Sequence, residues 1–225
     1  SKEFTALNFG FDGAGSLVKA LATIDFVTAD SYYPVKVALI LKRPSYLRLE
    51  VLPVIGSPDF LLTVTPAKMN ILIPSRGERY SGQPSVEHLK KFIPWPVNIE
   101  DMIMIFTGTY PSLNEKNIAY QAYWEEDILR VDMQAPSGNA QSVWVGKNNQ
   151  LLRVLRKDES GADVYSVDYV YDNDHRDFPE KITVNMADET TSLSVRYMDV
   201  QREQTRDLSV FELITPENVK EIILK

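Results

Sequence analysis

Apolar and polar residues alternate along most of this chain, and that alternation predicts extended strands. Apolar residues recur at every second position over residues 35–41, and the spacing returns at 47–51, 60–64 and 69–73. A period of two places successive side chains on opposite faces of a strand. Because only short polar or proline-containing intervals separate these segments, they predict an antiparallel meander.

The segment Ser16–Thr28 fits two patterns. Leu17, Leu21 and Ile24 have a helical spacing, whereas alternate residues along the same stretch are also apolar. The β-branched residues near its end favour a strand. Residues 1–15 are glycine-rich and are expected to form an irregular lead-in.

Two short amphipathic helices are predicted between residues 84 and 108. Ser85 and Asn98 are suitable N-caps, Pro94 and Pro96 would end the first helix, and Gly108 would follow the second. The apolar stripes of the two helices are Val86, Leu89 and Ile93, and Ile99, Met102, Ile103 and Phe106.

Strand patterns resume after Pro111 and continue almost to the end of the chain. Turn-forming residues separate them, and the tail Thr215–Leu224 is expected to be a short helix capped by Thr215. The candidate strands are Ile118–Trp124, Ile128–Gln134, Ser142–Gly146, Leu151–Arg156, Asp163–Tyr171, Lys181–Met186 and Thr191–Gln201.

Length and composition are compatible with one domain. The chain has 225 residues, 44% of them hydrophobic, and shows no internal repeat or low-complexity linker. We therefore expect a single α+β domain over residues 1–225, in which a strongly curved antiparallel sheet of about ten strands wraps the short helices.

Charge and cysteine content exclude several classes of function. The formal net charge is -7, from 31 acidic and 24 basic side chains, which disfavours binding to a nucleic-acid backbone or, without a local basic patch, to an anionic membrane. The absence of cysteine excludes disulfides, thiolate metal sites and cysteine nucleophiles.

No apolar run approaches the roughly 20 residues of a membrane helix. The first residues also lack the apolar core of a signal peptide, which fits either a cytosolic protein or a mature form whose signal has been removed.

Two candidate metal or catalytic motifs have simpler explanations. The run from Asp172 to Asp177 begins like a calcium loop, but its sixth residue is Asp177 instead of glycine and its twelfth is Thr183 instead of glutamate. A solvated turn is the favoured interpretation. His88 and His175 belong to no known metal-binding spacing, and no strained serine elbow accompanies them.

Two further motifs are also best explained structurally. Glu125, Glu126 and Asp127 are consecutive, so their carboxylates would point in different directions from a tight turn instead of facing one cleft. The glycines between Gly10 and Gly15 do not follow the order of a phosphate-binding loop. No cofactor is expected.

Aromatic residues allow two interpretations. Trp95, Trp124 and Trp144, together with 11 tyrosines and nine phenylalanines, could form an ordinary packed core. Alternatively, the curved sheet and the two helices enclose an apolar cavity, covered by the stripe of the second helix. Met102 in that stripe suits a variable ligand because its side chain is unbranched and polarisable.

A short motif near residue 45 resembles a known family. Lys42-Arg43-Pro44, followed by Tyr46, Arg48, Leu49 and Glu50, is similar to the strand–turn–strand that opens the half-barrel of LolA/LolB-type periplasmic lipoprotein carriers. Near the other end of the chain, Phe211, Leu213, Pro216 and Val219 fit a second element of that family.

The resemblance implies a half-barrel whose helices form a lid over an apolar cavity. Arg43 matches the arginine that latches the lid to the sheet, although a rim arginine that solvates a strand end is an equal alternative. The implied cavity and lid residues are Leu47, Leu49, Val51, Phe60, Leu62, Ile71, Leu89, Phe92, Trp95, Ile99, Met102, Ile103 and Phe106.

The loop Leu52–Pro58 is expected to protrude. In the anchored members of the family a loop between the third and fourth strands touches the acceptor membrane, and Val54 and Ile55 would form its tip here. The competing explanation is that the loop folds back onto the core.

The function implied by the resemblance is non-catalytic binding and transport of lipid or lipoprotein acyl chains in the bacterial envelope. The protein would be a monomer in the periplasm, anchored to the outer membrane through a lipidated N-terminal cysteine that this sequence lacks. The main alternative is a scaffolding envelope lipoprotein with a packed core that binds other proteins. A third alternative, an envelope hydrolase, lacks any assembled catalytic group in the sequence.

Overall fold

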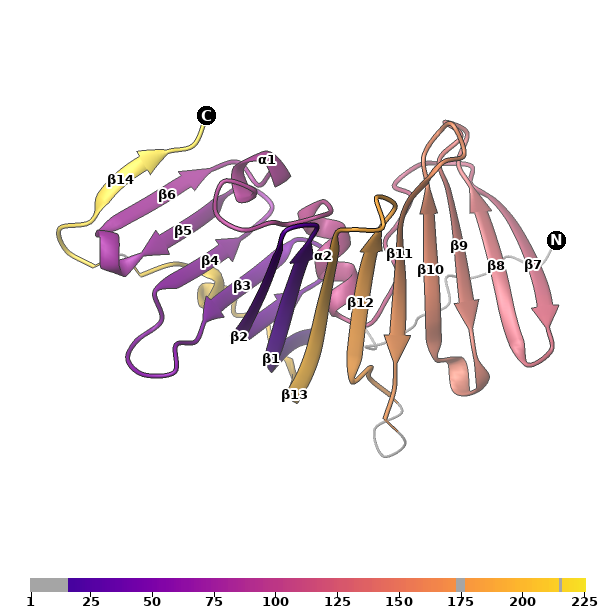
Figure 1. The fold of residues 1–225 in the computed structure, drawn as a ribbon, viewed down its shortest axis with the longest axis horizontal. Coiled ribbons are helices and arrows are strands. Elements are labelled where there is room, and N and C mark those ends of the chain that lie inside the picture. Colours follow the sequence, from indigo (N-terminus) through magenta and orange to yellow (C-terminus); the bar gives the residue numbers. More distant parts are fainter. Residues whose placement is uncertain (1–15, 173–176, 215) are drawn as a thin grey trace.

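The computed structural model describes residues 16–172, 177–214 and 216–225 and contains one curved, open sheet (Figure 1). Its 14 strands run in the order β14-β6-β5-β4-β3-β2-β1-β13-β12-β11-β10-β9-β8-β7. All neighbours are antiparallel except β14 and β6. The strands are β1 Ser16–Thr28, β2 Ser31–Lys42, β3 Tyr46–Val51, β4 Phe60–Val64, β5 Met69–Ile73, β6 Glu78–Gly82, β7 Ala119–Glu125, β8 Ile128–Gln134, β9 Ala140–Val145, β10 Leu151–Lys157, β11 Asp163–Val170, β12 Lys181–Met186, β13 Ser192–Gln204 and β14 Lys220–Ile223.

The alternation in the sequence corresponds to an inner face and an outer face of the sheet. Along β1, Ala22, Ile24 and Phe26 are buried on the inner face, while Leu21 is more than a third exposed on the outer one. Strand β1 pairs with both β2 and β13, so Ile24 lies between Val35 and Val195. The strand predicted for this ambiguous segment is confirmed, because neighbours on both sides satisfy its backbone groups.

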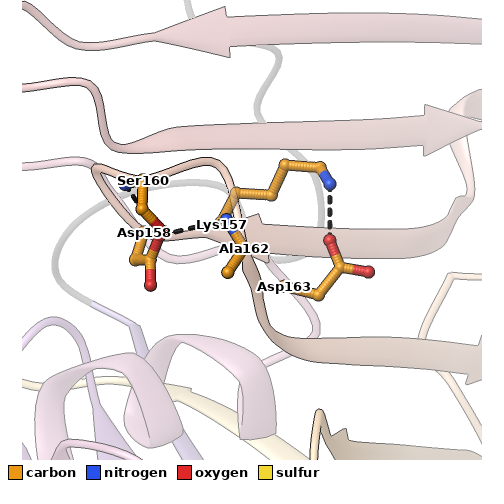
Figure 2. Close-up of polar contacts among 5 residues, drawn as sticks. All are labelled: Lys157, Asp158, Ser160, Ala162 and Asp163. Carbon is orange, nitrogen blue, oxygen red and sulfur yellow. Dashed lines mark hydrogen bonds and ion pairs between the residues drawn. The ribbon is translucent and has the colours of Figure 1, made fainter.

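Local turn chemistry connects β10 to β11. The Asp158 carboxylate accepts hydrogen bonds from the Ser160 hydroxyl at 2.6 Å and from the backbone N–H groups of Ser160 and Ala162, while Lys157 pairs with Asp163 across the two strands (Figure 2). Gly161 has a φ of +85°, which an L side chain adopts only with strain. The predicted turn over residues 158–161 is therefore confirmed.

The two predicted helices exist, but the first is shorter than predicted. Helix α1 spans Val86–Leu89 and α2 spans Ile99–Phe106. Ser85 and Asn98 cap them as expected, since the side chain of each accepts a hydrogen bond from the backbone N–H three residues later. In Figure 1, α2 lies behind the central strands β1, β2 and β13, whereas α1 lies near the end of β6.

Two elements at one edge of the sheet differ from the prediction. Strand β6 was not predicted, because Glu78, Arg79 and Ser81 give it little apolar alternation. The predicted C-terminal helix is wrong: Lys220–Ile223 is β14, which pairs in parallel with β6. The proposed cap, Thr215, lies outside the described residues. The open edge of β6 supplies backbone partners that a short isolated helix would lack.

Close contact between chain segments reinforces this edge. The Leu224 N–H donates to the Ser81 carbonyl at 2.8 Å, and a Cβ at Gly82 would lie 2.9 Å from the Leu224 Cβ. Any larger residue at position 82 would therefore displace the chain end.

The segment before β14 crosses the outer face of the sheet. Phe211 is buried and its ring centroid lies 5.3 Å from that of Tyr46 in β3. The Arg48 guanidinium donates to the Val210 carbonyl at 2.9 Å and pairs with Glu50. Residues from the two family-like motifs, far apart in sequence, are therefore packed together.

Candidate functional site

Three tyrosines on the inner face of the sheet hold α2 in place. The Tyr165 hydroxyl from β11 donates to the Asp101 carboxylate at 3.0 Å. At the other end of the helix, the Tyr197 hydroxyl donates to the Phe106 carbonyl at 2.6 Å, and Tyr169 donates to the Thr109 carbonyl at 2.8 Å. These contacts fix the helix over β11 and β13, and Tyr169 and Tyr197 occupy carbonyls that the helix end leaves unpaired.

The buried Asp101 carboxylate is the main ionisable group under the helices. Burial raises the pKa of Asp101, while the Tyr165 hydrogen bond and the nearby Arg156 act in the opposite direction. Burial also raises the pKa of Tyr165, so that its hydroxyl stays a donor. The hydrogen bond between Tyr165 and Asp101 joins β11 to α2 and so anchors the helix.

An open apolar groove of about 540 Å³ lies beside the helices. Strands β1, β2 and β3 form one wall, and the segment Lys90–Pro94 after α1 forms the other. The volume is within the usual range of small-molecule sites. The lining is Ile24, Phe26, Thr28, Ser31, Tyr33, Val35, Val37, Leu49, Val51, Lys90, Lys91, Phe92, Ile93 and Pro94.

The predicted cavity residues gather in one apolar cluster, but only some of them line the groove. Leu49, Val51 and Phe92 do, whereas Ile99 lines a separate pocket of about 350 Å³ beside the start of α2. Phe60 packs against the cluster while partly buried. The others are buried between the helices and the sheet: Leu47, Leu62, Ile71, Leu89, Trp95, Met102, Ile103 and Phe106.

Trp95 lies directly behind the groove. Its indole ring is 6.4 Å from Phe26, which lines the groove, and 6.0 Å from Phe106 of α2, both measured between ring centroids. The side chain is completely buried, and its Nε1–H has no acceptor within the described part of the chain. An unpaired buried donor costs about 1–3 kcal/mol, so a polar ligand atom reaching this depth would be stabilised.

The Lys42-Arg43-Pro44 turn lies close to the start of α2. The Ser45 hydroxyl donates to the Glu100 carboxylate at 2.8 Å, which connects the turn to the first turn of the helix. Arg43 is half-buried, and desolvation lowers the pKa of its guanidinium below the usual value. The Lys42-Arg43-Pro44 turn therefore lies next to a contact between the sheet and α2.

The loop between β3 and β4 leaves two aliphatic side chains in water. Val54 is 102% exposed and Ile55 is 90% exposed. Neither residue folds back onto the core. Gly56, the next residue, has a φ of +99° and allows the tight turn of the loop.

Among the described residues, the remaining candidate chemistry forms no site, and residues 10–15 and 173–176 of the candidate motifs lie outside them. The His88 ring lies 3.0 Å from the Gln83 carbonyl, and His175 lies outside the described residues. Glu125, Glu126 and Asp127 form the tight hairpin between β7 and β8, and Asp127 pairs with Lys147. The described residues contain no group of three or more carboxylate or histidine side chains placed to bind a metal.

No helix among residues 16–172, 177–214 and 216–225 is long and apolar enough to cross a membrane.

Sequence reasoning missed part of the groove. Tyr33 belonged to no predicted element and Val35 was only the start of a predicted strand, while Ile93 was assigned to the apolar stripe of the first helix and Pro94 to its end. The alternation did indicate which face of β2 points inward. It could not indicate that the segment after α1 stops short of that face and leaves space.

No family model and no curated protein matches this sequence. Solved structures with the same fold exist. A LolA superfamily protein from Nitrosomonas europaea is 14% identical with a TM-score of 0.57, and the match covers 92% of this chain and 94% of the other. An outer membrane lipoprotein-sorting protein domain from Vibrio parahaemolyticus is 11% identical with a TM-score of 0.52, covering 89% and 90%.

A third structure, a DUF1329 family protein from Desulfovibrio piger, is 12% identical with a TM-score of 0.61, covering 89% of this chain and 91% of the other. These matches extend over nearly the whole chain despite the low identity. The resemblance to LolA-type proteins predicted from the sequence is therefore confirmed as a distant relationship at the level of the fold.

Proposed function

We propose that this protein is a non-catalytic carrier that binds acyl chains of a lipid or lipoprotein in the periplasm of a bacterium. The observation that carries the proposal is the open apolar groove between β1–β3 and the segment Lys90–Pro94. Burial of each methylene in such a groove contributes about 0.8 kcal/mol. The lipoprotein-sorting protein with the same fold supports the choice of cargo.

The helical layer would act as the lid in this proposal. Lys90–Pro94 moves first, because it follows the four-residue helix α1 and is partly exposed. Helix α2 yields last, because three tyrosine hydroxyls hold it. Its movement would extend the groove toward Met102, Ile103 and Phe106, and a ligand carbonyl would then offer the Trp95 N–H an acceptor. Arg43 would latch the helical layer to the sheet.

Val54 and Ile55 would touch the acceptor membrane during release. Two fully exposed aliphatic side chains in water are unfavourable by roughly 25 cal/mol per Å² of apolar surface, and insertion between lipid headgroups would remove that cost.

The groove hypothesis is testable with a matched pair of variants on one strand. Val35→Asp places a carboxylate on the groove wall, whereas Ile40→Asp places one on the outer face of β2, where the side chain is also partly buried. We expect Val35→Asp to weaken uptake of a fluorescent fatty acid at least about tenfold, because the charge must be desolvated by the acyl chain.

Circular dichroism of both variants checks that the fold is kept. Native mass spectrometry of wild-type protein purified from an envelope fraction should show bound lipid or acylated peptide. Equal uptake by both variants, or a ligand-free wild type that takes up no added lipid, would refute the carrier.

A scaffolding protein is the second candidate, and the packing of the centre favours it. Trp95, Met102 and Phe106 are fully buried as the molecule stands. The ligand-free outcome above is the result expected of a scaffold, whose outer surface would then bind its partners.

A further inference from the structure

The mouth of the groove carries a pair of cations. Lys90 and Lys91 are exposed, and both line the groove whose depth is otherwise apolar. Backbone hydrogen bonds from Lys90 N–H to the Val86 carbonyl at 2.8 Å and from Lys91 N–H to the His88 carbonyl at 3.3 Å hold this turn at the end of α1. The two lysines are therefore held at the mouth, although their side chains can still move.

Neither ammonium group is paired with a carboxylate of the described residues. Within the described part of the chain, Lys90 and Lys91 form no ion pair within 4 Å, even though Glu87 precedes them by about one helical turn. Lys19, Lys147 and Lys157, by contrast, each pair with a carboxylate. On a chain with a net charge of -7, two adjacent lysines without such a pair form a local positive patch.

Hydroxyl groups also line this groove. Thr28 and Ser31 flank the turn between β1 and β2 and also line the groove, as does Tyr33. Hydroxyls and ammonium groups are hydrogen-bond donors toward phosphate oxygens. The positive charges and donors of the lining are therefore exposed or partly exposed, whereas its buried residues, such as Ile24, Phe26 and Val37, are apolar.

Exposed cations beside a buried apolar lining match an amphiphile with an anionic headgroup and apolar chains. We propose that the cargo is an acidic phospholipid, whose phosphate is bound by Lys90 and Lys91 while its acyl chains occupy the apolar groove. The inference rests on the proposed carrier function and specifies its ligand. Charge complementarity selects an anionic headgroup, because a zwitterionic one would place its own cation near the lysines.

The test uses two soluble phospholipids with equal chains, dioctanoyl phosphatidylglycerol and dioctanoyl phosphatidylcholine, each titrated below its micelle concentration. Isothermal calorimetry should show about tenfold tighter binding of phosphatidylglycerol. Lys90→Gln/Lys91→Gln should abolish that preference, because it weakens binding of phosphatidylglycerol more than binding of phosphatidylcholine. The control Lys36→Gln/Lys181→Gln removes the same charge from the outer face of β2 and β12 and should keep the preference.

The outcomes separate this inference from the function it rests on. Equal binding of both lipids by the wild type overturns the headgroup assignment and leaves the carrier intact. Binding of neither lipid, together with no uptake of a fatty acid, refutes the carrier as well. A preference that survives in the Lys90/Lys91 variant, or one that is lost equally in the control, also overturns the assignment.

Salt provides a measurement on the unmodified protein, should the variant fail to fold. The attraction between exposed lysines and a headgroup is screened at high ionic strength. The preference should therefore shrink between 0.02 and 0.5 M NaCl, to about a third or less. A preference independent of salt would contradict binding through these two lysines.

Discussion

Strands β5 and β7 belong to the same sheet but have opposite surroundings. All five residues of β5 are buried, whereas all seven residues of β7 are exposed. Strand β5 is paired on both sides and lies near the helices, while β7 is an edge strand paired only with β8. Within the described residues, no element covers either face of β7, so this edge strand buries little whatever its composition.

Two tryptophans differ in exposure in the same way as the two strands. Trp95 is 0% exposed under the helical layer, and Trp124 of β7 is 73% exposed. Both residues looked alike in the sequence as large apolar groups. The difference shows that the second layer, which covers only part of the sheet, determines where the core and the groove form.

The largest expected effect is a difference in the free energy of unfolding between a variant under the helical layer and a variant in β7. Phe106→Ala should lower the free energy of unfolding by about 3–5 kcal/mol, because it leaves a cavity between α2 and the sheet. Trp124→Ala should change it by about 0.5 kcal/mol or less. Urea unfolding of both variants measures the contrast. Equal losses would mean that β7 is covered in solution by a contact that the isolated chain lacks.

The sequence predicted the elements that depend on nearby residues and missed those that depend on a distant partner strand. The bounds predicted for β8 and β12 agree with the structure, because alternation and turn residues act within each segment. The two helix caps were also correct, since a cap needs only a side chain and the N–H groups next to it. Strands β6 and β14 could not be found this way, because a partner strand stabilises them more than their own pattern does.

The candidate site was predictable only in part. The apolar stripe of α2 was correctly placed against the sheet, yet the open groove lies beside it, where Phe92 and Pro94 face β2. Whether two apolar surfaces meet or leave a gap depends on distances between segments far apart in the chain. Alternation and helical spacing carry no information on those distances.

A smaller effect is expected where α2 is anchored. Tyr165→Phe removes the hydrogen bond to Asp101 and should cost about 1.5–3 kcal/mol, the range for bonds to a charged group. The measurement is urea unfolding at neutral pH. A loss well below this range would mean that water replaces the hydroxyl, and that α2 is less firmly held than its contacts indicate.

The pH dependence of the same anchor has a defined sign. Because burial raises the pKa of Asp101, the folded state binds more protons than the unfolded state between the unfolded and folded pKa values. The contribution of Asp101 to stability is therefore most favourable at pH values below its unfolded pKa, and it declines as the pH rises from the unfolded to the folded pKa. Asp101→Asn, measured beside the wild type over pH 4–8, should lack this decline.

The smallest effect is expected at the exposed turn between β10 and β11. Hydrogen bonds from the Ser160 hydroxyl and from backbone N–H groups lower the pKa of Asp158 (Figure 2). Its stabilisation is therefore present above the unfolded pKa and is lost as pH falls through the lower folded value. Asp158→Ala should be slightly less stable than the wild type at pH 7, and the two unfolding curves should converge in acid.

The matched control for that turn is Glu159→Ala, which alters the adjacent exposed carboxylate, for which the structure shows no such set of hydrogen bonds. If both variants lost the same stability at pH 7, general surface charge and not the turn would be the cause. A loss of stability that appears only for Asp158→Ala would show that local turn chemistry helps to maintain the register of β10 and β11.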